Sequence, residues 1–485
     1  MRFTSLPGDP DGEYVMIRFK TCFILAAVLL FPALCLGAQE ESLKFGRFGS
    51  ITLYREKPLP THVVLFVSGD GGWNKGVVDM ARELAGLDAL VAGIDIIHYL
   101  KVMEGTDEKC SYPAADFEGL SKYIQKKLGY PAYVPPVLVG YSSGATLVYA
   151  TLVQAPPNTF QGAISLGFCP DLELKKPFCR GYGLEWEILP RDKGYNFLPA
   201  KNLQAPWIAL QGGIDQVCNP AMTESFVKKV GGGKIVFLPK VGHGFSVPRN
   251  WMPQFKEVFM SLAASHTGAG DVRAQDLKDL PLVEVPAKAG STETFAVILS
   301  GDGGWAGIDR DLAGIIAEKG VPVVGLNSLQ YFWTRRSPDG ASRDLERILR
   351  HYLEAWKKQS ILLIGYSLGA DVLPFMASRL PADIANRVKL VALLGPGLEA
   401  EFEFRITEWL ESSSRREALP VQPEVEKLKV MKVLCISAAD ETDALCPRLD
   451  GSRVRKIILK GGHHFGGDYQ GLAETILREA EGKLE

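Results

Sequence analysis

The chain has 485 residues, which is enough for two or three domains of ordinary size. Its composition, 46% hydrophobic and 23% charged, is that of a globular protein. The formal net charge of −2 excludes a general attraction to nucleic acid or to an anionic membrane, so recognition of a charged substrate must be local.

The N-terminus has the three parts of a secretory signal. Residues 16–20 are basic, residues 21–36 are almost wholly apolar, and small residues follow up to Ala38. A membrane-spanning helix needs about 20 apolar residues, and Pro32 interrupts this shorter stretch. We therefore expect residues 1–38 to comprise an N-terminal extension and a cleaved signal peptide, and the mature protein to be periplasmic.

Two motifs occur twice in the chain. The sequence Ser-Gly-Asp-Gly-Gly-Trp stands at 68–73 and again at 300–305, and Gly-Tyr-Ser-Ser-Gly at 140–144 is matched by Gly-Tyr-Ser-Leu-Gly at 365–369. Such self-similarity indicates one domain present in two copies. We expect the first copy at 43–264, a linker rich in small and charged residues at 265–278, and the second copy at 279–485.

The predicted fold class is α/β. Short apolar runs such as 63–67 and 295–299 alternate with amphipathic stretches such as 77–87 and 343–356. This alternation predicts parallel β/α units with a sheet buried on both faces. Two tandem α/β-hydrolase-like domains follow, each a mostly parallel sheet flanked by helices.

Six cysteines remain after the predicted cleavage, and export makes disulfides chemically possible. The second copy holds only Cys435 and Cys446, which we expect to pair. The first copy holds four, which allow three pairings: Cys110, Cys169, Cys179 and Cys218.

Each copy carries a Gly-x-Ser-x-Gly pattern between an apolar run and a helix-like segment, around Ser142 and Ser367. In an α/β-hydrolase this context forms the nucleophile elbow, where glycines allow the tight turn that exposes the serine hydroxyl. A structural glycine-rich turn is the alternative interpretation.

A nucleophilic serine requires a histidine base and an acid to orient it, in the order serine, acid, histidine along this fold. The first copy supplies Ser142, Asp215 and His243. In the second copy Asp440, Glu441 and Asp443 compete as the acid. The serine-to-acid spacing of 73 positions (215 − 142) recurs for Asp440 (440 − 367), so Ser367, Asp440 and His463 are the predicted catalytic residues.

The first repeated motif lies where the fold places its oxyanion loop. Backbone N–H groups near Asp302 and Leu368, or near Asp70 and Ser143 in the first copy, are expected to hold the oxyanion. No Gly-Lys-Ser/Thr sequence follows, so a phosphate-cradling loop is not favoured. We expect neither a metal nor a cofactor.

Residues of the second copy suggest how a substrate is selected. Aromatic rings offer an apolar wall, paired arginines bind phosphate, and carboxylates bind an ammonium group. Ordinary solvated surface charge is an equally weighted interpretation of the charged members. The predicted substrate-binding residues are Trp305, Tyr331, Trp333, Arg335, Arg336, Glu441, Asp443 and His464. The last of these aligns opposite Gly244, beside the predicted base.

The second copy resembles the bacterial VirJ/AcvB virulence family. The resemblance rests on Ser-Gly-Asp-Gly-Gly-Trp305, Tyr-Phe-Trp333, Gly-Tyr-Ser-Leu-Gly-Ala-Asp371, Ala-Ala-Asp440 and Gly-Gly-His-His-Phe465. It extends to nearly the whole mature chain, because the exported two-copy layout is similar to AcvB-type members. One departure is the alanine pair before Asp440, where glycine is more usual.

The resemblance implies hydrolysis of the ester between lysine and phosphatidylglycerol in the periplasm, with the aminoacyl phospholipid as partner at the membrane surface. It also implies a link to virulence and to type IV secretion components. Two other functions stay open on the residues alone: a different lipase- or thioesterase-type hydrolase, and a non-enzymatic periplasmic adaptor. The first copy is either a second active site or a binding domain with an unused triad.

Overall fold

The computed structural model describes residues 39–264, 277–288, 290, 292–405 and 418–482. The predicted signal peptide and residues 265–276 of the predicted linker lie outside these ranges. Leu277, which we had placed in the linker, is fully buried in the core of the second copy. Among the described residues, no helix combines the length and hydrophobicity needed to cross a membrane.

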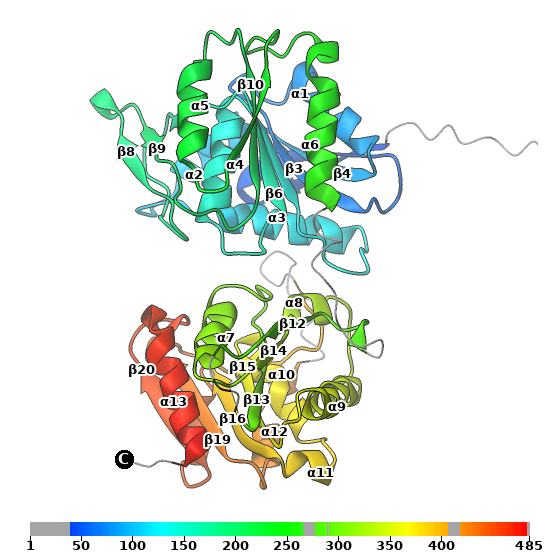
Figure 1. The fold of residues 1–485 in the computed structure, drawn as a ribbon, viewed down its shortest axis with the longest axis vertical. Helices are drawn as coiled ribbons and strands as arrows, with labels where there is room; N and C mark the ends of the chain where they lie inside the picture. Colours follow the sequence, from blue (N-terminus) through cyan, green and yellow to red (C-terminus); the bar gives the residue numbers. More distant parts are fainter. Residues whose placement is uncertain (1–38, 265–276, 289, 291, 406–417, 483–485) are drawn as a thin grey trace, which may run out of the picture. The chain divides into compact units, whose positions relative to one another are not determined.

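The first copy forms an eight-stranded sheet in the order β1-β2-β4-β3-β5-β6-β10-β11 (Figure 1). β1 and β2 run antiparallel at one edge, and the other six strands are parallel to one another. Its strands are β1 (Gln39–Phe45), β2 (Gly49–Arg55), β3 (His62–Val67), β4 (Ala89–Ile94), β5 (Val137–Tyr141), β6 (Gly162–Leu166), β10 (Trp207–Gly212) and β11 (Lys234–Leu238). Its helices are α1 (Lys75–Ala85), α2 (Ile96–Glu104), α3 (Pro113–Lys127), α4 (Ser143–Gln154), α5 (Pro220–Lys229) and α6 (Met252–Ala264). A small second sheet contains β7 (Asp171–Leu172), β8 (Trp186–Ile188) and β9 (Tyr195–Phe197).

The second copy forms a seven-stranded sheet in the order β12-β14-β13-β15-β16-β19-β20, with only β12 antiparallel to its neighbour. Its strands are β12 (Leu282–Val285), β13 (Thr294–Leu299), β14 (Val323–Leu326), β15 (Ser360–Tyr366), β16 (Val388–Leu394), β19 (Val433–Ala438) and β20 (Val454–Leu459), with a short pair β17 (Glu399–Ala400) and β18 (Leu419–Pro420). Its helices are α7 (Ile308–Glu318), α8 (Ser328–Tyr331), α9 (Pro338–Ala355), α10 (Leu368–Ala377), α11 (Ala382–Ala385), α12 (Gln422–Glu426) and α13 (Tyr469–Glu481). We call the two copies the first and second lobes.

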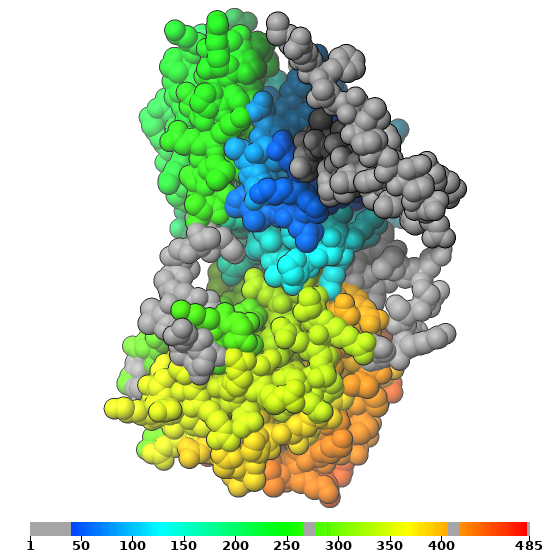
Figure 2. All heavy atoms as spheres, turned by 90° about the vertical axis from the view of Figure 1, so that its right-hand side faces the viewer, coloured from blue at the N-terminus to red at the C-terminus, as the bar shows by residue number. Residues whose placement is uncertain are grey.

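Both main sheets are buried on both faces, as their continuous apolar strands predict. Along β3, Val63, Leu65 and Val67 pack with α2, α3 and α4, whereas Val64 and Phe66 pack with α1 and α6. In the second lobe α9 and α10 cover one face, and α7 and α13 cover the other. Figure 2 shows the side chains around α9, in yellow-green, covering part of the second lobe's surface. The predicted α/β-hydrolase fold class is confirmed for both lobes.

The tryptophan of each repeated motif is a core residue. Trp305 is 4% exposed, and a β-carbon added to Gly325 of β14 would lie only 2.2 Å from its ring. In the first lobe the ring of Trp73 lies equally close to Gly93 of β4, at 2.1 Å. Each indole therefore packs flat against a strand glycine, because burying its large apolar surface is favourable. The prediction that Trp305 binds substrate is wrong.

Three disulfides link the six cysteines. The predicted Cys435–Cys446 bond is confirmed. In the first lobe, where the sequence left three pairings open, the bonds are Cys110–Cys179 and Cys169–Cys218.

Replacing Gly325 with alanine will destabilise the protein, because the new methyl group must displace the Trp305 ring. Overpacking of this kind costs about 1–3 kcal/mol of unfolding free energy. Urea unfolding followed by tryptophan fluorescence measures it. Gly314→Ala is the matched control, since Gly314 lies in α7 with nothing within 4 Å of an added β-carbon. That control should be neutral or slightly stabilising. Equal stability of the two variants would contradict the packing role.

Candidate active sites

Each lobe turns sharply at a serine between a strand and a helix. Ser142 lies between β5 and α4 with φ 56° and ψ −123°, and Ser367 lies between β15 and α10 with φ 51° and ψ −121°. A positive φ is unfavourable for a residue with a side chain, so the surroundings must hold it. A β-carbon on Gly140 would lie 2.1 Å from the carbonyl oxygen of Gly144, and the corresponding distance in the second lobe is 2.4 Å. Only glycine fits there, and both turns are nucleophile elbows.

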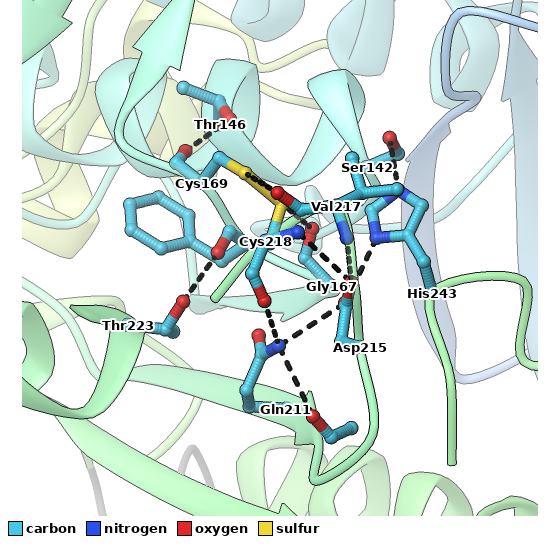
Figure 3. Close-up of a disulfide and its surroundings, with 12 residues drawn as sticks. Ser142, Thr146, Gly167, Cys169, Gln211, Asp215, Val217, Cys218, Thr223 and His243 are labelled. Carbon is cyan, nitrogen blue, oxygen red and sulfur yellow. Dashed lines mark hydrogen bonds and ion pairs between the residues drawn. A yellow bond between two sulfur atoms is a disulfide. The ribbon is translucent and has the colours of Figure 1, made fainter. Parts of the chain in front are cut away.

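The first lobe brings its three predicted residues together (Figure 3). Ser142 Oγ lies 2.9 Å from His243 Nε2, and His243 Nδ1 lies 2.9 Å from Asp215 Oδ2. When Nδ1–H donates to the carboxylate, Nε2 is free to accept the serine proton. This is the complete hydrogen-bonded relay of a serine hydrolase.

The acid of this relay is fixed by its own loop. Asp215 Oδ1 accepts hydrogen bonds from the backbone N–H groups of Val217 and Cys218, both at 2.9 Å, and Gln211 donates to Oδ2 at 3.2 Å. The side chain of Asp215 is 0% exposed. The disulfide between Cys169 and Cys218 ties this loop to the segment after β6, as Figure 3 shows. The acid is therefore held in place before any substrate arrives.

In the second lobe the acid is Glu441. Its Oε1 forms a short hydrogen bond with His463 Nδ1, and its Oε2 accepts from the N–H of Ala438 at 2.8 Å. Asp440 is exposed and makes no hydrogen bond with His463 among the described contacts. The prediction of Asp440 as the catalytic acid is corrected to Glu441, which we had assigned to substrate binding.

Strand register explains the correction. Gly213, the first residue after β10, donates its N–H to Leu238 at 2.8 Å, and Ala439, the first after β19, makes the same bond with β20 at 2.8 Å. Asp215 and Glu441 each lie two residues beyond these matched positions. The serine-to-acid spacing is therefore 73 in one lobe and 74 in the other (441 − 367). The assumption of an equal serine-to-acid spacing in the two copies gave the wrong acid, because connecting loops change length without disturbing the strands.

His463 occupies the same place as His243, although its bond to the serine is not formed. The imidazole centroid of His463 lies 5.2 Å from the Tyr366 ring at 34°, compared with 5.8 Å and 35° between His243 and Tyr141. Each tyrosine hydroxyl donates to the carbonyl of its histidine. The described contacts include no hydrogen bond between Ser367 and His463, whose side chain is 41% exposed. The second triad is in position but more open than the first.

His464 is a neighbour of the base, as its alignment opposite Gly244 indicates. Its Nδ1 lies 3.2 Å from the hydroxyl of Tyr366. Burial, and to a lesser degree the nearby His463, lowers the pKa of His464, so it is neutral at physiological pH. It can orient Tyr366 beneath the catalytic imidazole.

The repeated glycine loop lies directly against each nucleophile. A β-carbon on Gly69 would lie 2.9 Å from Cβ of Ser142, and one on Gly301 would lie 3.5 Å from Cβ of Ser367. Ser300 Oγ anchors the loop by accepting from the N–H of Ser328 at 2.9 Å. This is the expected place of an oxyanion loop. The particular N–H donors, those of Leu368 and Asp302, stay a prediction.

Two predicted aromatic contacts are not available to a substrate. Tyr331 and Trp333 are each 1% exposed. The Tyr331 hydroxyl donates to Asp344 at 2.6 Å, and the Trp333 ring stacks on Phe404 at 5.8 Å between centroids. The prediction of an apolar wall from these rings is wrong, because they bury their area in packing.

The charged candidates lie partly in a separate cavity. Arg335 and Arg336 line a cavity of about 510 Å³ together with Glu401 and Glu403. Its lining includes no triad residue among the described ones. Asp443 is exposed in the loop that follows the catalytic Glu441.

Two acids near the second elbow, the half-buried Asp371 and the buried Asp309, are not among the predicted site residues. Asp371 is in the first turn of α10 and accepts from the N–H of Gly397 at 2.7 Å. Burial raises the pKa of Asp371 to about 8, with Asp302 of the oxyanion loop adding to the effect. Burial also raises the pKa of Asp309 well above its usual range, opposed by a hydrogen bond from Gly301. Asp309 Oδ1 is buried with no hydrogen-bond partner among the described residues.

The first lobe has no counterpart of these acids. Counting from the shared motifs, Val77 stands where Asp309 is, and Thr146 stands where Asp371 is. The Thr146 hydroxyl instead donates a hydrogen bond to the carbonyl oxygen of Cys169. An acid present in one copy and absent from the other is the sequence feature that distinguishes Asp309 and Asp371 as residues specific to the second site.

A serine in a strained turn, facing an imidazole that a carboxylate orients, is the machinery of a serine-type hydrolase, and this chain carries it twice. Several solved structures are similar to about half of the chain at low sequence identity. A protein described as a dienelactone hydrolase from Klebsiella pneumoniae is 15% identical, over 47% of this chain and 99% of that chain, with a TM-score of 0.35. A lidless serine hydrolase from Xanthomonas campestris is 17% identical, over 50% and 99%, with a TM-score of 0.32. An esterase domain from Rhodothermus marinus is 12% identical, over 47% and 98%, with a TM-score of 0.32.

No curated protein matches the chain in sequence. The family model described as bacterial virulence protein (VirJ) matches residues 61–167 and 293–484. The chain belongs to the VirJ family.

Substituting the acid will separate Glu441 from Asp440. Glu441→Gln leaves His463 without a carboxylate, so labelling of Ser367 by a fluorophosphonate should slow by about 10³-fold or more. Asp440→Asn makes the same chemical change one residue away and should leave the rate within about twofold. Mass spectrometry of the Ser367 peptide measures both rates. The reverse order would restore Asp440 as the acid.

Asp371 gives the unfolding free energy a defined pH dependence. Its folded pKa of about 8 exceeds the unfolded value near 3.8, so the folded state retains a proton that the unfolded state loses between these values. Wild-type stability therefore falls as pH rises through this window. Asp371→Asn removes this contribution to the pH dependence of stability and keeps a side-chain oxygen that accepts the hydrogen bond from the N–H of Gly397. Its stability relative to wild type should rise between about pH 5 and about pH 8 in urea unfolding. The exposed Asp443→Asn should show no such trend, and a pH-independent difference for Asp371→Asn would contradict the assignment.

Proposed function

We propose that the protein is an exported serine esterase whose second lobe hydrolyses the aminoacyl ester of lysyl-phosphatidylglycerol. The observation that carries the proposal is the nucleophile elbow of Ser367, with His463 in register and Glu441 bonded to its Nδ1. The family relationship supports the second lobe, since the VirJ match covers its whole triad within residues 293–484, whereas the match to the first lobe, residues 61–167, ends before Asp215 and His243.

The reaction follows from these groups. Ser367 attacks the carbonyl carbon of the lysyl ester while His463 accepts the serine proton, and the phosphatidylglycerol hydroxyl leaves with that proton. Water then attacks the acyl-serine through the same base and releases lysine. The bond between Ser367 and His463 forms when substrate binds, because catalytic hydrogen bonds in empty sites are often long.

The acids around the second elbow support a cationic acyl group. Asp309 is buried and Asp371 half-buried beside the oxyanion loop, and loss of hydration raises the pKa of both carboxyls. A substrate ammonium group would favour their ionised forms and gain charge-assisted hydrogen bonds. Arg335 and Arg336 remain the proposed partners of the phosphate.

The disulfides support export. All three lie within the described residues, and disulfides persist in oxidising compartments such as the periplasm. The proposal places the enzyme at the outer face of the inner membrane, where the phospholipid is presented. An association with type IV secretion components is part of this proposal through the family resemblance alone.

Ser367→Ala tests the proposal directly. Release of free lysine from vesicles containing lysyl-phosphatidylglycerol should fall by about 10³-fold or more, because the second lobe then has no nucleophile and the first lobe lacks counterparts of Asp309 and Asp371. An unchanged melting temperature would show that the fold survives. Ser142→Ala, assayed beside it, removes the first-lobe nucleophile and should leave lysine release nearly unchanged. Undiminished release by Ser367→Ala would remove the proposed function.

A further inference from the structure

We propose that the first lobe is a second, independent active site, in which Ser142 hydrolyses carboxylic esters with an uncharged, apolar acyl chain. The inference rests on the geometry of the first lobe and does not require the lysyl ester to be the substrate of Ser367. It assigns a chemical class that the second lobe is not built to accept.

The catalytic groups of the first lobe are already assembled. The two hydrogen bonds from Ser142 to His243 and from His243 to Asp215 are both 2.9 Å long. The His243 side chain is 17% exposed, compared with 41% for His463. An unused triad would not need an acid held by two backbone N–H groups and a disulfide-linked loop. Preorganisation of this kind is what lowers the barrier to acyl transfer.

These groups open into a cavity of about 430 Å³, within the usual range for small-molecule sites. Ser142 and His243 line it together with the glycine loop. The other side chains of the lining are the apolar Val77, Met80 and Val217, together with Asn74 and Tyr141. The cavity therefore presents the nucleophile beside three apolar side chains.

The charge of the cavity differs from that of the second site. Val77 and Thr146 stand where the second lobe has the buried Asp309 and the half-buried Asp371. Asp95 stands where the second lobe has Asn327, but backbone N–H groups occupy its two oxygens. Asp70 lines the cavity, but the second lobe has the same residue as Asp302, so it does not distinguish the two sites. An ammonium group that entered the first lobe would lose its hydration, and no counterparts of Asp309 and Asp371 would be there to compensate. An apolar chain has no such hydration to lose.

Exposed apolar side chains follow the strands at the carboxyl edge of the sheet, where this cavity lies, and we call them the apolar rim. Val217 is 68% exposed and lines the cavity, and Ile97, 52% exposed, lies 3.5 Å from where a β-carbon on Gly72 of the glycine loop would be. The other members follow β10 or β11 at the same carboxyl edge of the sheet. The rim consists of Ile97, Ile214, Val217, Met222 and Val247.

The second lobe has acids at this edge instead. By the strand register, Asp440 stands where Ile214 is, and Asp443 lies in the loop that corresponds to that of Val217. Exposed apolar groups gathered at one mouth indicate a binding surface. We assign the rim to the part of the acyl chain that extends beyond the cavity.

The chemistry balances without a cofactor. Ser142 Oγ bonds to the ester carbonyl carbon while its proton passes to His243 Nε2. The C–O bond to the alcohol breaks, and the alcohol leaves with that proton. Water then attacks the acyl carbon, returns a proton through His243 to Ser142, and frees the carboxylic acid. Asp215 stays ionised and orients the imidazole throughout.

Serine substitutions in the full chain test the assignment. With p-nitrophenyl octanoate, Ser142→Ala should lose about 10³-fold in kcat/KM, and Ser367→Ala should retain more than half of the wild-type value. Melting temperatures show whether each variant is folded. Octanoate hydrolysis that survives in Ser142→Ala but disappears in Ser367→Ala would overturn the inference. Lysine release measured on the same variants is a separate result, so failure of the lysyl ester as a substrate leaves this test intact.

A rim substitution tests the acyl class. Ile97→Asp should lower kcat/KM for p-nitrophenyl octanoate by roughly tenfold and that for p-nitrophenyl butyrate by about twofold or less, because Ile97 belongs to the rim but does not line the cavity and only the longer chain reaches it. Val430→Asp is the matched control, since Val430 is 70% exposed and precedes β19 at the opposite end of the second sheet. It should change neither value. An equal loss for both esters in Ile97→Asp would overturn the assignment of the rim to the acyl chain.

Discussion

The close backbone approach at each elbow is the constraint on which the rest of the structure depends. Gly140 and Gly144 nearly touch, and this contact holds Ser142 at a positive φ that its side chain alone would not favour. The hydroxyl consequently projects from the carboxyl edge of the sheet. Parallel strands deliver the acid and the histidine to the same edge, so residues about a hundred positions apart meet there.

The same frame carries two different electrostatic environments. In the first lobe Val77 and Thr146 flank the nucleophile, and the acid is fully removed from water. In the second lobe Asp309 and Asp371 occupy the equivalent positions. A buried carboxyl is costly when ionised and unpaired, and protonation relieves that cost, which is why burial raises the pKa of both groups. The two copies therefore share one catalytic frame and differ in the charged groups around the nucleophile.

The two triads also differ in how tightly they are held. Asp215 is short, and backbone N–H groups and Gln211 fix it from several sides. Glu441 has one more methylene group, and its second oxygen bonds to the strand end at Ala438. The longer acid reaches His463 from the same loop position, while the imidazole stays more exposed.

The sequence by itself determined the elements that depend on local pattern. Continuous apolar runs identified both sheets, the repeated glycines identified both elbows, and the lone cysteine pair of the second copy identified Cys435–Cys446. The sequence also identified Ser142, Asp215 and His243 as one triad, because they follow the order serine, acid, histidine that the α/β-hydrolase fold requires. These features follow from periodicity and from backbone sterics, which neighbouring residues specify.

Only the tertiary structure decided what depends on register and burial. Glu441 replaced Asp440 because the strands, and not the intervening loop lengths, set which acid faces the imidazole. Trp305, Tyr331 and Trp333 proved to be packing residues, since an aromatic ring buries its area whether or not a site is near. The pairing of four cysteines and the burial of Asp309 and Asp371 likewise depend on which distant segments come together, and a linear pattern does not contain that information.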